Sequence, residues 1–383
     1  MVTALVLSGG GARGAYEVGV LSELLPELER LGEAPSIIVG TSVGAFNAAF
    51  LASNAHRPAA DATADAIGFW HELGWTDSLA PIGSPGNEPS RRRLLAQLLG
   101  VRRPRVHGVL DPSPLERTLG RLVSFDQVAE NVASGALGSV AVTATSALTG
   151  RTVVFHAGGK SPERDSVRQI DYVESALTSE QVRASGSIPA LFPAVHVGSP
   201  ERARGWYYDG GTRLNTPIKP ALALGADRVV VIGLNSIAGP PSEPLAGPRR
   251  PDVFEGSSLV MQSLLIDRLV DDMRELAAEN EPGGDERLIP YIFVAPQKRD
   301  EIGAIAARVW TERYSGARGL LRDRDLSLLG RSLAGGDDAE HGELLSLLFF
   351  SPEFAAELIE LGKRDARDLI AAGELWRTGP LPG

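Results

Sequence analysis

The chain has 383 residues, 43% hydrophobic and 22% charged, which is typical of a globular protein with one large domain or two ordinary ones. Its formal net charge of −10 argues against nucleic acid as the main partner. The absence of cysteine excludes disulfides and thiolate nucleophiles, and it fits a cytoplasmic location. No run approaches the roughly 18 apolar residues of a membrane span, so we expect any membrane contact to be peripheral.

The N-terminal part of the chain predicts two strands, each followed by a turn and a helix. The strands are expected over 4–8 and 36–39, and the helices over 15–31 and 43–53. Leucine and valine recur at helical spacing in the first helix. The short apolar start lacks the basic region of a secretory signal and is better explained as a strand. This order of elements predicts an α/β sandwich with parallel strands.

The middle of the chain predicts an insertion and then further strands. Residues 81–114, rich in Pro, Gly and Arg, indicate a surface insertion or lid. Strands over 138–145 and 151–156 should form a hairpin, and a helix should cover about 172–184. An apolar run at 229–234 predicts a strongly buried strand.

The last third begins with a proline-rich linker at 238–251. An amphipathic helix is expected over 256–279 and a final strand over 288–295. The pattern after about 300 is helical and charged. The apolar run 344–350 favours a buried helix segment, with a lid or membrane-touching helix as the alternative.

A serine lies inside a G-x-S-x-G motif, between the second predicted strand and the helix after it. In such a turn the hydroxyl of Ser42 would stand at a helix N-terminus, where it could act as a nucleophile. Gly40 and Gly44 flank it, because side chains would collide in so sharp a bend. The alternative is a serine that only caps the helix.

A glycine-rich loop, GGGARG, follows the first predicted strand. Its backbone amides could stabilise the oxyanion of a tetrahedral intermediate, and the following helix would add its positive end. Gly10 and Gly11 are the favoured donors, and Arg13 could hold the loop or an anionic head group. The glycines that we assign to this oxyanion hole are Gly9, Gly10, Gly11 and Gly14.

The same loop satisfies the dinucleotide fingerprint G-x-G-x-x-G, so a nucleotide-binding α/β protein is an alternative. A dinucleotide site would require an acidic residue at the end of the second strand. That strand instead runs into Val39, Gly40, Thr41 and Ser42. The missing acid favours the hydrolase hypothesis.

An activated serine requires a base. Asp209 is the best candidate, because Gly210 and Gly211 behind it permit close backbone approach. An ordinary turn would also explain Asp-Gly-Gly. A histidine triad is a further alternative, with His196 and His341 as the residues to test.

Three motifs in this order resemble those of the patatin-like phospholipase family: GGGARG at 9–14, GTSVG at 40–44 and DGG at 209–211. The stretches 184–193 and 215–227 are similar to two further segments of that family. One departure is Ser8, which stands where plant members tend to have aspartate. The likeness covers about residues 3–235, and at most extends to 296.

The resemblance implies a three-layer α/β/α sandwich with a mostly parallel central sheet. We expect an acyl hydrolase domain over 1–300, with a helical C-terminal extension over 301–383 packed on it. The extension also permits a regulated effector with low basal activity.

The resemblance further implies a Ser42–Asp209 dyad that needs neither metal nor cofactor. The implied substrate is a lipid or acyl ester, cleaved as by a phospholipase A, a lysophospholipase or an esterase. Peripheral membrane contact is expected, and the arginines at 91–105 either meet anionic head groups or are simply solvated.

Overall fold

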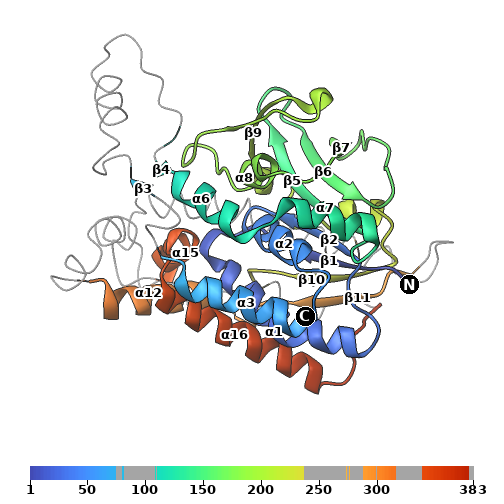
Figure 1. Cartoon of the computed structure of the whole chain (residues 1–383). Coiled ribbons are helices and arrows are strands. Elements are labelled where there is room, and N and C mark those ends of the chain that lie inside the picture. Colours follow the sequence, from blue (N-terminus) through green and yellow to red (C-terminus); the bar gives the residue numbers. More distant parts are fainter. Residues whose placement is uncertain are drawn as a thin grey trace, which may run out of the picture.

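The computed structural model describes most of the chain (Figure 1). The described residues are 1–74, 80–81, 108, 110–236, 273, 276, 288–298, 300–315 and 339–378. Most of the predicted insertion with its arginines, the linker at 238–251 and nearly all of the helix at 256–279 lie outside them.

A mixed sheet forms the centre of the protein. Its main path runs β11 (Tyr291–Val294), β10 (Arg228–Ile232), β1 (Thr3–Leu7), β2 (Ile37–Thr41), β5 (Ser139–Ser146), β6 (Thr152–Gly158) and β7 (Ile170–Glu174). The pairs from β11 to β5 are parallel, and so is β6 with β7, whereas β5 and β6 form the predicted antiparallel hairpin. β9 (Gly205–Asp209) pairs with β5, and β8 (Val195–Val197) pairs with β9. A separate short pair joins β3 (Ala80–Pro81) and β4 (Leu110–Asp111).

Helices cover both faces of the sheet. Side chains that alternate along each strand face two different cores, since successive strand residues point to opposite faces. Leu5 and Leu7 pack with α1 (Gly14–Arg30), α2 (Val43–Ser53) and α16 (Pro352–Ala371). Ala4 and Val6 pack on the other face with α9 (Ile218–Ala223) and Met273. The predicted three-layer α/β/α fold with a mostly parallel sheet is confirmed.

The remaining helices lie around this framework (Figure 1). They are α3 (Ala59–Glu72), α6 (Ser113–Leu122), α7 (Phe125–Ser134), α8 (Ser179–Ser185), α12 (Glu301–Arg313) and α15 (Ala339–Leu348), with short turns η1 (Gly11–Arg13), η2 (Glu201–Ala203) and η3 (Gly210–Thr212). None of the helices in the described ranges is long and apolar enough to cross a bilayer.

The helical C-terminal part packs closely on α1. A Cβ at Gly19 would collide with the carbonyl of Ile359 in α16, and one at Gly362 would collide with the carbonyl of Tyr16. The backbones of α1 and α16 therefore touch, which requires glycine at the crossing. The buried Tyr16 hydroxyl also donates to Asp365 at 2.9 Å.

One predicted helix is wrong over much of its length. Residues 172–184 were expected to be helical, but 170–174 form β7 and the helix α8 begins only at Ser179. Ile170 and Val173 are the buried positions of β7, which pairs with β6 at the edge of the sheet. Thr178 then starts α8 with a capping box to Gln181, which sets the true N-terminus of the helix.

Candidate active site

Ser42 lies in the sharp turn between β2 and α2. Its backbone has φ 54° and ψ −123°, an uncommon conformation that holds a non-glycine residue under strain. A Cβ at Gly40 would collide with the Gly44 carbonyl, and one at Gly44 with the Leu7 carbonyl. The two glycines are thus required by the tight packing of the turn against β1. Ser42 is 6% exposed and lies at the N-terminus of α2.

Asp209 lies at the end of β9 and reaches this serine. Pairing of Asp209 with Ala144 places the end of β9 beside β5, which itself runs next to β2. The Ser42 hydroxyl donates to Asp209 Oδ2 at 2.7 Å. The other carboxylate oxygen, Oδ1, accepts the amide of Gly211 at 2.6 Å. A Cβ at Gly210 would collide with Thr143, so a glycine is needed there too.

Burial raises the pKa of Asp209 to about 7, because the ionised form loses its hydration. The hydrogen bonds from Ser42 and from the Gly211 amide act in the opposite direction and are smaller causes. A carboxyl group with a pKa near neutrality can hold or release a proton at physiological pH, which is the property required of a general base.

The glycine loop approaches Ser42 closely. A Cβ at Gly9 would lie 3.0 Å from the Ser42 Cβ and 2.5 Å from the side-chain oxygen of Asn215. The Gly9 amide donates to the Asn215 carbonyl at 3.2 Å, and the Gly14 amide donates to the Gly11 carbonyl. In the part of the chain that the structure describes, the amides of the two middle glycines, 10 and 11, have no acceptor. Of the four predicted donors, these two are the ones left available.

Arg13, expected to hold the loop or an anionic head group, makes its hydrogen bonds to other groups of the protein. The guanidinium is buried and donates to Ser346 Oγ at 2.8 Å and to Asn235 Oδ1 at 2.7 Å. It also donates to the carbonyl and the carboxylate of Glu343, both at 2.7 Å. Glu343 and Ser346 belong to α15, so the C-terminal extension anchors the loop beside the serine.

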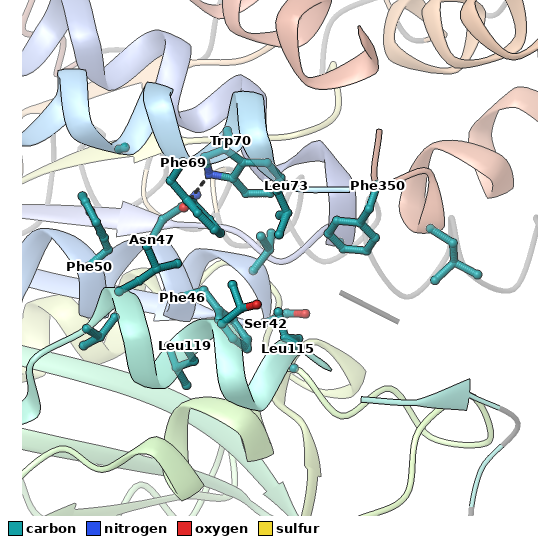
Figure 2. Close-up of a pocket in the computed structure, with 18 of the residues that line it drawn as sticks. Ser42, Phe46, Asn47, Phe50, Phe69, Trp70, Leu73, Leu115, Leu119 and Phe350 are labelled. Atoms are coloured by element: carbon teal, nitrogen blue, oxygen red, sulfur yellow. Dashed lines mark hydrogen bonds between the residues drawn. The ribbon is translucent and has the colours of Figure 1, made fainter. Parts of the chain in front are cut away.

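An apolar pocket opens beside Ser42 (Figure 2). In the close-up, Trp70 and Leu73 lie on one side of the serine, and Leu115 and Leu119 lie on the other. The space is about 820 Å³, including its open mouth. Its lining comes from the glycine loop, α2, α3, α6, the segment after α8 and the end of α15 with the residues that follow it. The aromatic members are Phe46, Phe50, Phe69, Trp70, Phe192 and Phe350.

The C-terminal segment 344–350 contributes to this pocket. Leu345 and Phe349 are buried, which confirms the favoured prediction of a buried helix segment. Phe350 stacks on Trp70 with ring centroids 6.5 Å apart. Leu347 and Leu348 also line the pocket. A region outside the motifs therefore forms part of its wall.

A second buried carboxyl group lies behind the pocket wall. Glu17 in α1 accepts a hydrogen bond from Asn47 Nδ2 at 2.8 Å, and Asn47 Oδ1 accepts one from Trp70 Nε1 (Figure 2). Glu17 Oε1 has no partner among the described residues. Burial raises the pKa of Glu17 to about 8, against smaller lowering by Asn47 and the Ser8 amide. A pKa above neutrality favours the protonated form of this carboxyl group at neutral pH.

His196 is not among the described residues that line the pocket beside Ser42. His196 is exposed on β8, where its ring contacts Trp206 at 5.1 Å between centroids. The side chain of His341 lies outside the described residues. The group that meets the Ser42 hydroxyl is the carboxylate of Asp209.

Several residues of the site carried no signal of their own in the sequence. Ser185 Oγ accepts the Ser42 amide at 2.8 Å, and Asn215 holds Gly9 through both its carbonyl and its side chain. Both residues lie in stretches similar to the family, which is the signal that could have found them. Ser8 donates to the Ile232 carbonyl and lies 2.9 Å from Thr216 Oγ1, so it ties β1 to its neighbours.

The family model for Patatin-like phospholipase matches residues 5–222, more than half of the chain and all three motifs. This chain belongs to the patatin-like phospholipase family. The expected resemblance is confirmed, and membership supports lipid hydrolysis as the class of activity.

Two solved structures are similar to the chain, at low identity. VipD from Legionella pneumophila is 12% identical, with 99% of this chain and 68% of that chain covered and a TM-score of 0.37. In the heterodimeric complex ExoU-SpcU from the type III secretion system of Pseudomonas aeruginosa, the matching chain is 18% identical. That alignment covers 97% of this chain and 76% of the other, with a TM-score of 0.25. No curated protein matches the sequence. Scores this low carry no argument about function.

Proposed function

We propose that this member of the patatin-like phospholipase family is a serine-dependent lipid acyl hydrolase. Ser42 is the nucleophile, Asp209 is the base, and the glycine loop supplies the oxyanion hole. The observation that carries the proposal is the 2.7 Å hydrogen bond from the Ser42 hydroxyl to a buried carboxylate. Neither a metal nor a cofactor enters the reaction.

The reaction has two halves. Ser42 Oγ attacks the acyl carbon while its proton passes to Asp209 Oδ2, and the carbonyl oxygen becomes an oxyanion. Collapse of this intermediate breaks the ester bond, and the leaving alcohol takes the proton from Asp209. Water then attacks the acyl-enzyme with Asp209 again as base, which releases the fatty acid and restores the serine.

The glycine loop would bind the oxyanion, and the pocket would bind the acyl chain. The amides of Gly10 and Gly11 are the proposed donors to the oxyanion, since those of Gly9 and Gly14 already have backbone acceptors. Loss of one such donor typically costs about 2.7–4 kcal/mol of transition-state stabilisation. The apolar pocket is the proposed acyl-chain site, because its lining offers hydrocarbon contact beside the nucleophile.

The proposal is tested by labelling with a fluorophosphonate probe, followed by peptide mapping. The wild-type chain should be labelled at Ser42, and Ser42→Ala should abolish labelling. Ser134→Ala, which replaces a serine of α7, is the matched control and should label as the wild type does. Equal labelling of Ser42→Ala and wild type would refute the proposed nucleophile.

A further inference from the structure

Exposed large apolar side chains gather at one end of several neighbouring strands of the sheet. Leu148 is 92% exposed, Val167 is 89% exposed and Trp206 is 58% exposed. Each belongs to a turn or strand at the end of β5, β6, β7 or β9, which lie together in the upper part of Figure 1. We call this group of three residues the Leu148 edge.

Backbone hydrogen bonds place Leu148 beside Trp206. β5 ends at Ser146 and enters the turn that carries Leu148. The Ala147 amide donates to the Trp206 carbonyl at 2.9 Å, directly beyond the pairing of Ser146 with Tyr207. The two exposed apolar side chains therefore belong to adjacent backbone segments.

Val167 belongs to the loop before β7, on the same edge. The Thr152 amide, at the start of β6, donates to the Gln169 carbonyl at 3.1 Å. The strands follow one another as β7, β6, β5 and β9. Because neighbouring strands lie about 4.8 Å apart, the Leu148 edge is roughly 15 Å wide.

The candidate nucleophile lies at the same end of these strands. β2 and β5 run parallel, with Thr41 beside Thr143, so Ser42 follows the carboxyl end of β2 on the side toward which β5 also runs. Along β9, the exposed Trp206 stands three positions before Asp209. At about 3.3 Å per residue, the tryptophan stands roughly 10 Å from the proposed base.

Basic side chains accompany the apolar ones. Arg151 and Arg164 share Asp171, at 2.8 and 2.7 Å. Residues 151–171 hold four basic side chains, Arg151, Lys160, Arg164 and Arg168, against three acids, Glu163, Asp165 and Asp171, a balance of +1. The whole chain carries −10, so the Leu148 edge lacks the negative excess that would repel anionic head groups.

We propose that the Leu148 edge is the surface that contacts lipid membranes. Leu148 and Trp206 enter the interfacial layer, where tryptophan is favoured, and the arginines meet the head groups. This inference rests on the proposed function, because it explains how a lipid substrate comes within reach of Ser42.

The test measures vesicle binding without turnover, in a Ser42→Ala background. Vesicles of phosphatidylcholine and phosphatidylglycerol are sedimented with the protein. The change Leu148→Ser with Trp206→Ser should weaken binding about tenfold or more, since two large apolar side chains lose their contact with lipid. Leu31→Ser is the matched control: this leucine is 43% exposed at the end of α1, and its replacement should leave binding unchanged.

Fluorescence gives an independent readout. Brominated lipids should quench the tryptophan emission of the chain, and Trp206→Phe should remove most of that quenching. Absence of vesicle binding, or equal weakening by Leu31→Ser, would overturn the inference. Labelling of Ser42 by the fluorophosphonate probe does not involve vesicles, so such a result would leave the proposed hydrolase standing. Conversely, vesicle binding without labelling would refute the nucleophile and retain the membrane surface.

Discussion

Two buried carboxyl groups lie near Ser42, and they differ in what they touch. Asp209 has a pKa of about 7 and accepts the Ser42 hydroxyl. Glu17 has a pKa of about 8 and accepts a side-chain amide behind the pocket wall. In both cases burial is the largest cause of the shift. A raised pKa therefore marks a desolvated group, whereas contact with the nucleophile distinguishes a base.

The carboxyl groups of Asp209 and Glu17 are also held in place by different contacts. Asp209 is held by backbone pairing of β9 with β5 and by the Gly211 amide, so its position follows from the sheet. Glu17 is held on α1 by the Asn47 side chain and the Ser8 amide, and has one oxygen without a partner in the described ranges. A neutral Glu17 avoids burying an uncompensated charge, which fits a structural role.

The largest expected effect is on turnover when Asp209 is replaced. Asp209→Asn keeps the shape of the side chain but removes the base, so kcat on a soluble acyl ester should fall about 10²–10⁴-fold. Glu17→Gln, the matched change at the other buried carboxyl group, should leave kcat within roughly threefold, because Glu17 does not touch the serine. Equal losses of kcat in the two variants would contradict the assignment of Asp209, and not Glu17, as the base.

The pH dependence of turnover should follow Asp209. A base acts when it is deprotonated, so kcat/KM should rise about tenfold per pH unit below pH 7 and level off above it. Glu17→Gln should not move this midpoint. A profile measured from pH 5 to 9 on wild type and variant would check both statements, and a midpoint lost in Glu17→Gln would contradict them.

Stability should depend on pH through Glu17, with a definite sign. Its pKa rises from 4.5 to about 8 on folding, so the folded chain retains a proton that the unfolded chain releases. The contribution of Glu17 is thus fully present below about pH 4.5 and is lost as pH rises through 8. Glu17→Gln should consequently be more stable relative to wild type at pH 9 than at pH 5. Urea unfolding midpoints at the two pH values measure this difference, and a reversed sign would show that Glu17 is ionised in the fold.

The smallest expected effect concerns histidine. His196→Ala removes an exposed ring that contacts Trp206, so kcat/KM on a soluble ester should change by less than about twofold. A loss comparable with that of Asp209→Asn would revive the histidine triad and remove Asp209 from the role of base.

Much of the fold could be predicted from the sequence because its signals are local. Apolar runs and helical spacing gave the strand–turn–helix order around Ser42, and the helix expected over 43–53 is α2. The prediction failed at 172–184, where pairing of Ile170–Glu174 with β6 overrides a helical pattern. Strand pairing depends on a partner elsewhere in the chain, which spacing alone does not reveal.

For this protein, the sequence by itself determined the turn at Ser42 and the glycines around it, because the backbone conformation of a tight bend depends on adjacent residues. The tertiary structure alone decided which distant groups meet there. It brings Asp209 across 167 positions to the serine and joins Arg13 to Glu343 across 330. It also assembles the pocket from the glycine loop, α2, α3, α6, the segment after α8 and the C-terminal segment. These contacts arise from sheet order and helix packing, which are properties of the whole chain.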